Sequence, residues 1–577
     1  LGILPAWGGS TRLPRLVGIE AALDLILTGK DLYPKKALRI GFADALFPDA
    51  RFLDLVRDFA RERMAAGGDR KRTGRSGGRG GGIRALMLEK NPLGRKLLFD
   101  QAAKRARATT GGHYPAPIRA LEVVRTGVEE GLEAGFDAEA RAVAELAVQP
   151  VTKNLIHVFQ LLESAKKATG VEGGAAREVS SLAVLGAGVM GGGIAQLAAA
   201  KGLPVQLKDI RAEALASGLE HAAGVFRKQV EKGRLSKDEM RRKLALIRPS
   251  LDYTGFRRAD LVIEAVVEKL GVKQAVLAEV AGHVRDDSVL ASNTSALSID
   301  AIALDTPAPE RVAGMHFFNP VDRMPLVEVV AGERSAPWVV NTAFELARKL
   351  GKTAVLVTDT PGFLVNRLLT FSLGEALWLL DEGSQVEDID RAMKRWGMPM
   401  GPIALTEEVG IDVAFEVART LNGAFGDRLP LPGWIDRLTE DGRLGAKNAK
   451  GFYRYEKGER QDPDRSVYAL LGVAPTVEHP DERAIVDRMV LRMVDEAARC
   501  LEEGVVRSPA ELDLAMIFGT GFPPFRGGVC RYADQRGLGD VLGSLERLAA
   551  EVGQRFRPSE SLRKAAENGG FYARWKK

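Results

Sequence analysis

Apolar and polar positions alternate with different periods along the chain, and the changes of period predict its elements. In residues 83–170 apolar positions recur three and four residues apart, which predicts amphipathic helices. Between residues 180 and 358 short β-branched runs alternate with helical patterns, which favours a parallel sheet with helices on both faces. The candidate strands are residues 181–185, 204–207, 260–264, 288–291, 312–317 and 354–357. From residue 361 onward the pattern is mainly helical.

The first 82 residues show two further patterns. Residues 1–66 have the pattern of the end of an α/β unit, with a helical stretch, turns and a short apolar strand between residues 18 and 47. Residues 67–82 are rich in glycine and arginine and lack apolar anchors, which indicates a flexible linker. The chain begins with Leu1, and no basic stretch precedes an apolar one, so we expect a fragment without a signal peptide.

The helical part contains an internal repeat. Three dipeptides near its start recur 121 residues further along the chain. They are Asn366-Arg367 with Asp487-Arg488, Glu375-Ala376 with Glu496-Ala497, and Glu382-Gly383 with Glu503-Gly504. After a small insertion the matches continue with Ala392-Met393 and Ala515-Met516, Gly397 and Gly521, and Pro399 and Pro523. Two tandem helical domains of similar plan are the simplest explanation.

Composition, charge and cysteine content exclude several classes of protein. Hydrophobic residues make up 45% and charged residues 27% of the chain, the balance of a globular protein. A net charge of +6 over 577 residues is a weak field and does not argue for a nucleic-acid or membrane partner. The two cysteines, Cys500 and Cys530, exclude a disulfide framework and favour a reducing compartment, so we expect a cytoplasmic protein. The chain lacks the run of 18 apolar residues that a membrane span needs, and we expect no metal site.

A glycine-rich turn joins the first candidate strand to the helical pattern that follows it. Gly186, Gly188 and Gly191 stand in the order GxGxxG directly after residues 181–185. Gly186 allows a tight turn, Gly188 lets the backbone approach a pyrophosphate, and Gly191 permits close packing of helix on strand. The helix N-terminus supplies N–H groups and positive partial charge to the phosphates. The alternative is a glycine-rich turn without a ligand.

An acidic residue, Asp209, closes the second candidate strand 23 residues after Gly186. A carboxylate there can hydrogen-bond the ribose hydroxyls of a dinucleotide and repels a 2′-phosphate, which favours NAD over NADP. Arg211 stands two residues further and works against that preference. Strand, turn, helix and acidic residue together predict a dinucleotide-binding unit.

Among the six histidines, His316 has the most informative surroundings. It lies near the end of a candidate strand, and Glu328 follows twelve residues later inside the apolar run 326–330. A carboxylate in a β-run needs a partner, because an isolated buried charge is costly. A His316–Glu328 pair would be a general base whose ring is oriented, and whose cationic form is stabilised, by the carboxylate. The alternative is a histidine with a structural role.

Five motifs, in this order and at these spacings, resemble the 3-hydroxyacyl-CoA dehydrogenase family. They are residues 186–191, Asn293-Thr294-Ser295, His316-Phe-Phe-Asn-Pro320, Leu326-Val-Glu-Val329 and Pro361-Gly-Phe-Leu-Val-Asn-Arg367. The preceding half and the doubled helical part resemble the large α-subunits of bacterial fatty-acid β-oxidation complexes.

This resemblance implies an α/β protein with a Rossmann-type NAD-binding domain followed by two tandem all-α domains. A partial crotonase-like α/β segment and a helical linker region precede them. The implied segments are a crotonase-like remnant (1–66), the glycine- and arginine-rich linker (67–82), the helical linker region (83–178), the NAD-binding domain (179–360), the helical dehydrogenase domain (361–457) and its degenerate second copy (458–577).

The resemblance also implies NAD-dependent oxidation of (S)-3-hydroxyacyl-CoA to 3-oxoacyl-CoA in fatty-acid β-oxidation. His316 would take the proton of the 3-hydroxyl, and Glu328 would orient and polarise His316. Ser295 would hydrogen-bond the reacting oxygen, Asn366 would hold the region of the substrate carbonyl, and Lys232 would contact the CoA phosphates. Taken alone, Ser295 has the alternative of a helix N-cap and Asn366 that of a capping or packing residue. The residues implied to bind NAD are Gly186, Gly188, Met190, Gly191, Asp209, Glu268, Lys273 and Asn293.

The two helical copies are expected to differ in function. Asp487 occupies the position equivalent to Asn366, so the second copy should be a non-catalytic structural duplicate. In the single-domain family the helical domain pairs with that of a second subunit. A tandem copy would satisfy the same surface within one chain.

The N-terminal end and the partners are also interpreted through the resemblance. Residues 1–15 resemble the second half of an enoyl-CoA hydratase domain, whose two acidic catalytic residues and oxyanion-hole amides lie upstream of this segment. Ala6 stands where that family usually has glycine. We therefore expect no hydration by this chain, although a full-length parent would carry that activity. An acyl-CoA substrate and a thiolase β-subunit partner are implied as well.

Two other classes of protein are alternatives to an enzyme. A nucleic-acid-binding protein would use the arginine- and glycine-rich run 70–84, but this run has no interleaved aromatic residues to stack on bases. A non-catalytic scaffold for a thiolase partner is disfavoured because Ser295, His316, Glu328 and Asn366 are all present.

Overall fold

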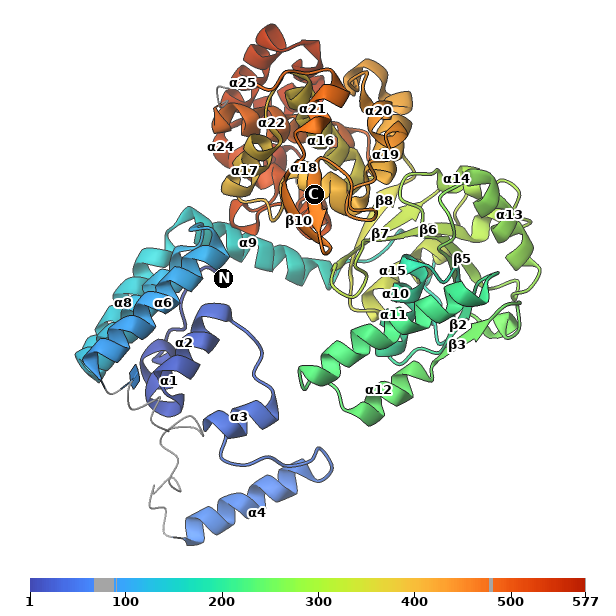
Figure 1. Ribbon diagram of the computed structural model, residues 1–577. Coiled ribbons are helices and arrows are strands. Elements are labelled where there is room, and N and C mark those ends of the chain that lie inside the picture. The colour runs from blue at the N-terminus through green and yellow to red at the C-terminus, as the bar shows by residue number, and fades with distance from the viewer. Residues whose placement is uncertain (67–87, 90, 477–480, 576–577) are drawn as a thin grey trace. The chain divides into compact units, whose positions relative to one another are not determined.

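The computed structural model describes residues 1–66, 88–89, 91–476 and 481–575 of the chain. They form two compact units, Leu1–Ile156 and His157–Lys577, which are described separately below (Figure 1). The predicted linker at residues 67–82 lies outside the described residues.

The described part of the N-terminal unit contains helices joined by turns and irregular segments. Its helices are α1 (Gly9–Val17), α2 (Ile19–Thr28), α3 (Pro34–Ile40), α4 (Phe52–Ala65), α6 (Pro92–Thr110), α7 (Pro115–Glu129), α8 (Leu132–Ala147) and the start of α9 (Pro150–Ala165). Helices α7 and α8 pack side by side, and α1 and α2 pack on α7. The buried Glu139 of α8 fastens α1 to this pair, because its carboxylate accepts hydrogen bonds from the backbone and hydroxyl of Thr11, at 3.2 and 2.9 Å.

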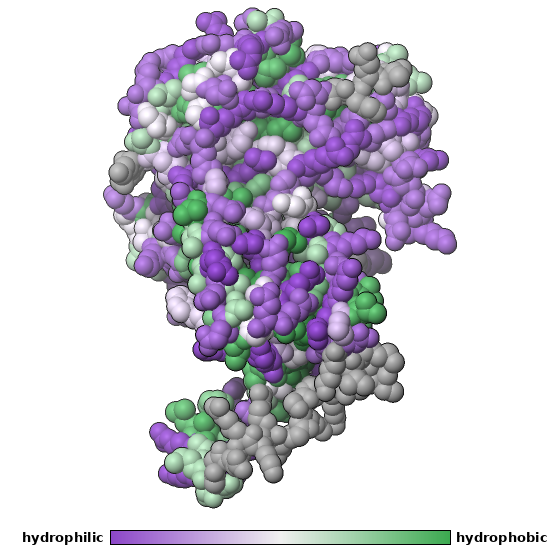
Figure 2. All heavy atoms as spheres, turned by 90° about the vertical axis from the view of Figure 1, so that its left-hand side faces the viewer, coloured by the Kyte–Doolittle hydropathy of each residue, from purple (hydrophilic) through white to green (hydrophobic). Residues whose placement is uncertain are grey.

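The short apolar strand expected between residues 18 and 47 is absent, and residues 1–66 contain only helices, turns and irregular segments. An apolar run becomes a strand only where a neighbouring strand pairs with its backbone, and this segment has none. Helix α4 has no buried residue, and Leu53 and Met64 are 66% and 78% exposed. Figure 2 shows apolar surface at the level of this helix.

The second unit is built on an eight-stranded sheet with the order β3-β2-β1-β4-β5-β6-β7-β8. The strands are β1 (Leu182–Leu185), β2 (Val205–Lys208), β3 (Ile247–Ser250), β4 (Leu261–Glu264), β5 (Val289–Ser292), β6 (Val312–Phe317), β7 (Leu326–Ala331) and β8 (Thr353–Thr358). All neighbours are parallel except β6 and β7, which are antiparallel. This confirms the predicted parallel sheet and adds two strands to the six expected ranges. One is β7, which covers the apolar run 326–330, and the other is β3, an edge strand whose Ile-Arg-Pro-Ser sequence carries no apolar run.

Helices cover both faces of the sheet, as the continuous apolar strands predict (Figure 1). They are α10 (Val189–Ala200), α11 (Ala212–Glu231), α12 (Lys237–Leu244), α13 (Leu270–Ala281), α14 (Ile299–Ile302) and α15 (Pro337–Lys349). Apolar residues of α10, α11 and α15 share one core with the sheet, and those of α13 and α14 share another. Along β6, Met315 and Phe317 face the first core and Val312 faces the second, so His316 points to the second.

The described part of the chain between residues 365 and 575 is mainly helical and includes one β-hairpin. Its elements are α16 (Val365–Asp381), α17 (Val386–Trp396), α18 (Pro402–Val409), α19 (Ile411–Phe425), α20 (Ile435–Glu440), β9 (Tyr453–Glu456), β10 (Glu459–Pro463), α21 (Ser466–Leu471), α22 (Glu482–Glu502), α23 (Pro509–Thr520), α24 (Val529–Arg536), α25 (Leu538–Glu551), α26 (Glu560–Glu567) and α27 (Phe571–Arg574). Sequence patterning missed the hairpin, and the expected domain boundary at residues 457/458 falls in its turn.

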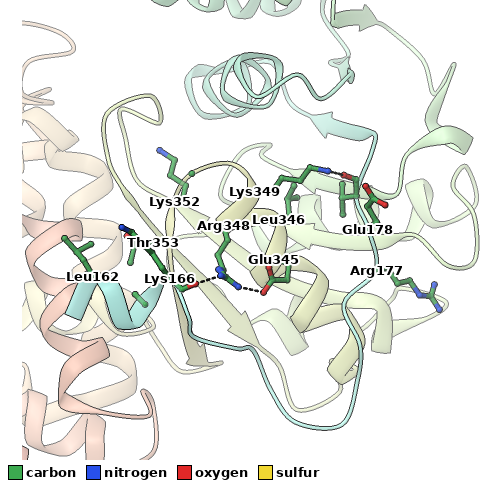
Figure 3. Close-up of a pocket in the computed structure, with 13 residues that line it drawn as sticks. Leu162, Lys166, Arg177, Glu178, Glu345, Leu346, Arg348, Lys349, Lys352 and Thr353 are labelled. Carbon is green, nitrogen blue, oxygen red and sulfur yellow. Dashed lines mark hydrogen bonds and ion pairs between the residues drawn. The ribbon is translucent and has the colours of Figure 1, made fainter. Parts of the chain in front are cut away.

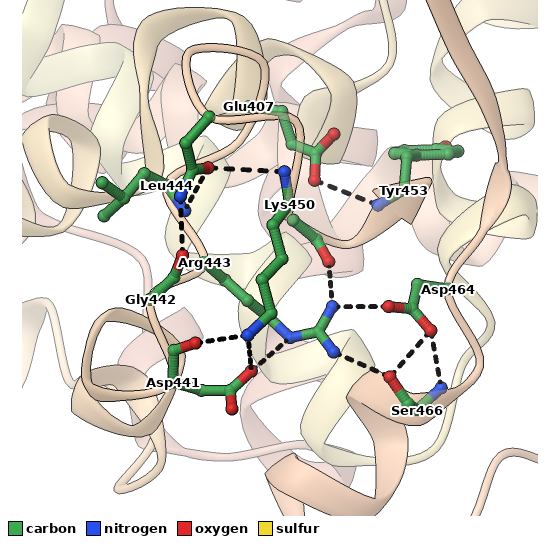
Figure 4. Close-up of polar contacts among 11 residues, drawn as sticks. Glu407, Asp441, Gly442, Arg443, Leu444, Lys450, Tyr453, Asp464 and Ser466 are labelled. Atoms are coloured by element: carbon green, nitrogen blue, oxygen red, sulfur yellow. Dashed lines mark hydrogen bonds and ion pairs between the residues drawn. The ribbon is translucent and has the colours of Figure 1, made fainter. Parts of the chain in front are cut away.

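A buried arginine ties the hairpin to the helices before it (Figure 4). The guanidinium of Arg443 contacts Asp441 at 3.0 Å, Asp464 at 2.8 Å and the hydroxyl of Ser466 at 2.7 Å, and it also donates to the carbonyl of Gly451. Because these partners lie before and after the hairpin, one side chain closes the loop that contains it.

The repeat predicted from the sequence reappears as reciprocal ion pairs between α16 and α22, which pack on each other. Arg367 of α16 contacts Glu496 at 2.6 Å and Glu503 at 2.7 Å. The equivalent Arg488 of α22 contacts Glu375 at 3.1 Å and also pairs with Glu382. The arginine of each copy therefore pairs with the same two glutamates of the other copy. This is the arrangement of an isologous dimer interface, formed here within one chain.

Candidate active site

His316 and Glu328 are direct cross-strand neighbours. They lie opposite each other in the antiparallel register of β6 and β7, which places their side chains on the same face. The Nδ1 atom of His316 is 2.7 Å from Oε2 of Glu328, and both side chains are buried. A carboxylate only accepts, so the neutral ring carries its proton on Nδ1 and keeps Nε2 as an acceptor.

The second oxygen of Glu328 is held by the start of α16. Its Oε1 accepts hydrogen bonds from the backbone N–H groups of Leu364, at 3.2 Å, and Val365, at 2.9 Å. The preceding Phe363 has a φ of 50°, in the left-handed region that a non-glycine residue adopts only when its surroundings enforce it. The two backbone N–H groups at this helix N-terminus therefore hold the Glu328 carboxylate in place.

Asn366 links α16 to the loop that carries Ser295. Its Nδ2 donates to the carbonyl oxygen of Ser295 at 2.8 Å, and it follows directly on Val365, which holds Glu328. Ser295 is not a helix N-cap, because Ser298 caps α14. The four residues predicted to be catalytic are thus brought together by one set of contacts. Asn293 lies two residues before Ser295 in the same loop, and its Oδ1 accepts a hydrogen bond from the backbone N–H of Phe317 at 2.8 Å.

Glu268 and Lys273 form an internal cluster behind this loop. Lys273 is fully buried, and its ammonium lies 2.9 Å from Glu264 and 3.1 Å from Glu268. Burial raises the pKa of Glu268, but Lys273 and hydrogen bonds from Thr294 and Ser295 lower it further, so the net pKa lies below the ordinary value. The Glu268 carboxylate accepts from the backbone N–H of Ser295 at 2.8 Å and thereby positions this loop.

This cluster contains Lys273, for which cofactor binding stays a prediction. Its ammonium is enclosed by two carboxylates and has no exposed surface, so its described contacts are with the protein alone. Glu264 is not indicated by the sequence pattern, because it stands as the last residue of an apolar strand. An acidic residue at a strand end, nine positions before a lysine in a helical pattern, was the available signal.

The glycine turn fits the pyrophosphate of a dinucleotide. Gly186 has a φ of 92°, and a Cβ on Gly191 would lie 1.8 Å from the carbonyl oxygen of Gly186. At Gly188 no heavy atom lies within 4 Å of an added Cβ, so the space in front of the turn is open. Helix α10 begins there without a side-chain cap, which leaves its first N–H groups available to an anion. Met190 lies half-buried in its first turn.

Asp209 buttresses this turn. One of its oxygens accepts from the backbone N–H of Ala187 at 2.8 Å and the other from that of Arg211 at 3.0 Å. Each carboxylate oxygen has a second lone pair for a ribose hydroxyl, so the contacts fit NAD. Lys232, predicted to contact CoA, lies on the surface just after α11, and no described contact joins it to the dyad.

A cavity of 520 Å³ lies elsewhere, between the end of α9, α15 and the start of β8 (Figure 3). Its basic side chains are turned to carbonyls and carboxylates: Arg348 contacts Glu345 at 2.6 Å, and Lys349 donates to Val179 at 2.7 Å. It contains none of the predicted site residues. Among the described residues no group of histidine, cysteine and acidic side chains has the arrangement of a metal site, and no helix is long and apolar enough to cross a membrane.

Comparisons with known proteins agree with this geometry. Residues 181–360 match the family described as 3-hydroxyacyl-CoA dehydrogenase, NAD binding domain, and residues 362–455 and 485–574 both match that family's C-terminal domain. The fatty acid oxidation complex subunit alpha of Idiomarina loihiensis is 41% identical over 575 residues, covering 99% of this chain and 80% of that protein. The protein of the same name from Shewanella sp. (strain ANA-3) is 40% identical over 579 residues, with the same coverage.

A solved structure is similar as well. The 3-hydroxybutyryl-CoA dehydrogenase of Escherichia coli K12 is 32% identical, with a TM-score of 0.60 over 68% of this chain and 99% of its own. The chain therefore belongs to the 3-hydroxyacyl-CoA dehydrogenase family, with an NAD-binding domain followed by two copies of the family's C-terminal domain.

Proposed function

We propose that His316 and Glu328 form the general base with which this NAD-dependent 3-hydroxyacyl-CoA dehydrogenase oxidises (S)-3-hydroxyacyl-CoA to 3-oxoacyl-CoA in fatty-acid β-oxidation. The observation that carries the proposal is the 2.7 Å contact between His316 Nδ1 and Glu328 Oε2. It supports a neutral ring whose Nδ1–H donates to the carboxylate, so that Nε2 is the atom that would take a proton.

The proton moves through groups of this chain. NAD⁺, when bound at the glycine turn, supplies the acceptor for the hydride that leaves C3 of the substrate. His316 Nε2 takes the proton of the 3-hydroxyl, and the ring becomes cationic. Glu328 stabilises that cation, because its charge is fixed by two backbone N–H groups and cannot turn away.

The neighbouring loop supplies the polar contacts for the substrate. In this proposal the Ser295 hydroxyl would hydrogen-bond the oxygen on C3, and the support is that Glu268 and Asn366 hold the backbone of Ser295 from both sides. Asn366 keeps its amide oxygen for a further partner while its nitrogen donates to Ser295. Together these contacts hold the substrate oxygen near His316.

Replacing His316 by Gln tests the proposal. NADH oxidation with acetoacetyl-CoA should fall about 10²–10⁴-fold in kcat, the usual contribution of a general acid or base. The Kd for NADH, measured by its fluorescence, should stay within twofold, because His316 is not part of the glycine turn. A loss of NADH binding in this variant, or a kcat close to that of the unchanged protein, would contradict the role.

The assembly and location of the protein are part of the same proposal. The similar proteins from Idiomarina and Shewanella carry names of complex subunits, which supports a complex here too, with a thiolase β-subunit as partner. Two buried free thiols, Cys500 and Cys530, support a reducing compartment and so the cytoplasm. Co-purification with a thiolase from the native host, and fractionation of its cells, test these two points.

A further inference from the structure

The carboxylate of Glu264 lies at the centre of the buried cluster behind the Ser295 loop. It is fully buried at the end of β4, and its two oxygens lie 2.9 and 3.2 Å from the ammonium of Lys273. One oxygen accepts a hydrogen bond from the hydroxyl of Ser292 at 2.7 Å and the other from the backbone N–H of Val266 at 2.8 Å. Both oxygens are therefore engaged, and Glu264 is held in one position.

The cluster carries one negative charge in excess. Two carboxylates, Glu264 and Glu268, share the single ammonium of Lys273, at 2.9 and 3.1 Å. Glu268 is ionised because its net pKa lies below the ordinary value of a glutamate, and contact with a buried ammonium favours the charged form of Glu264. The charge of Glu264 is removed from solvent, so salt and water screen it much less than they screen a surface charge.

This cluster lies along the path that a dinucleotide takes across the sheet. The glycine turn follows β1, Asp209 follows β2 on one side of it, and β4, β5 and β6 come in order on the other side. The segment after β4 touches the turn, because a Cβ on Gly186 would lie 2.5 Å from the carbonyl oxygen of Ala265. A dinucleotide binds along the carboxyl ends of such strands. With its adenosine ribose at Asp209, its nicotinamide end extends past β4, which Glu264 ends, toward His316 on β6.

We propose that the buried charge of Glu264 favours the oxidised form of the cofactor, by attracting the positive nicotinamide ring of NAD⁺ and so raising the affinity for NAD⁺ relative to NADH. The oxidised ring carries one positive charge that the reduced ring lacks, and the remaining groups of the two cofactors are the same. A fixed negative charge therefore acts on this difference. The inference rests on the proposed function for the cofactor, NAD, but not for the role of His316.

Glu264→Gln tests the proposal because it keeps the size of the side chain and removes its charge. The amide oxygen can still accept from Val266 and Lys273, and the remaining pair of Lys273 and Glu268 is neutral overall. For charges about 10 Å apart at an effective dielectric constant of about 20–40, the ratio of Kd for NAD⁺ to Kd for NADH should rise about four- to sixteenfold. NADH fluorescence gives its Kd, and competition with NADH gives that of NAD⁺.

Two matched variants separate charge from packing. Asp260→Asn removes a carboxylate that precedes the opposite end of β4 and also accepts hydrogen bonds from backbone N–H groups. Ser292→Ala removes a hydrogen bond of Glu264 but leaves its charge. Both variants should lower the stability measured in urea and leave the ratio of the two Kd values within twofold.

Glu268→Gln gives a second test that does not depend on a change at a fully buried site. The side chain of Glu268 is 40% exposed, and any contact it makes with the ribose is common to both cofactors, so this variant should also raise the ratio. An unchanged ratio in Glu264→Gln, or in Glu268→Gln where the first variant does not fold, would overturn the inference. An equal rise in Asp260→Asn or Ser292→Ala would overturn it too. Failure of the proposed base would look different, because His316→Gln would then keep its kcat while Glu264→Gln still changed the ratio.

Discussion

Glu328→Gln removes one charge from the centre of the proposed base and keeps its shape. Glu328 accepts three hydrogen bonds, from His316 at 2.7 Å and from the backbone of Leu364 and Val365 at 3.2 and 2.9 Å. A glutamine can satisfy both backbone donors only with its oxygen, which turns its NH₂ group toward His316. Nδ1 must then accept, so the ring proton moves to Nε2 and the base is lost.

The magnitude follows from that change of tautomer. Loss of a general base costs about 10²–10⁴-fold, and a wrong tautomer in a histidine–carboxylate pair reaches the upper end of this range. We therefore expect kcat to fall about 10³–10⁴-fold, with unfolding stability reduced by only about 1–2 kcal/mol because the backbone donors stay paired.

The assay is steady-state oxidation of NADH by acetoacetyl-CoA, with the Kd of NADH and urea unfolding measured on the same preparation. Glu333→Gln, an exposed site just after β7, is the matched control and should behave like the unchanged protein. A fall of less than tenfold in kcat for Glu328→Gln, in a folded protein, would refute the tautomer argument.

Two further predictions concern the helical part. Arg367→Met and Arg488→Met each break one of two equivalent sets of buried ion pairs. Each variant should lower the free energy of unfolding, measured in urea, by a similar amount of about 3 kcal/mol. Strongly unequal values would argue against the paired arrangement. His157 contacts the hydroxyl of Tyr572 at 2.9 Å. Its pKa is lowered from 6.5 to about 4, mainly because the ring is buried and to a smaller extent because Arg531 is positively charged. A base with a lowered folded-state pKa loses stability as pH falls, so the thermal midpoint should decrease from pH 6.5 toward pH 4, and less so in His157→Gln.

Much of the sheet could be predicted from the sequence because its strands are buried on both faces. Such strands are continuous apolar runs, and β1, β4 and β6 fall within a residue of the expected ranges. Strand β3 is different, because it is a polar strand at the edge of the sheet, and its pairing with β2 rather than its composition makes it a strand. The strand expected between residues 18 and 47 failed for the converse reason, since no partner is present there.

The active site likewise contains features that could be predicted from the sequence and features that could not. His316 and Glu328 could be paired from the sequence because each stands in an apolar β-run and a buried carboxylate needs a partner. Two features depend on three-dimensional packing and do not follow from sequence spacing alone. One is the pair of backbone hydrogen bonds from the N-terminus of α16 to Glu328, which depends on the left-handed backbone at Phe363. The other is the burial of Lys273 between two carboxylates.

A crystal structure of the protein with NAD⁺ and a 3-hydroxyacyl-CoA analogue tests the central claim most directly. The account predicts that His316 Nε2 lies about 2.6–3.2 Å from the oxygen on C3, with Nδ1 still on Glu328 and the nicotinamide on the opposite side of that carbon. A substrate oxygen held by other groups, with the imidazole of His316 turned away from it, would contradict the account.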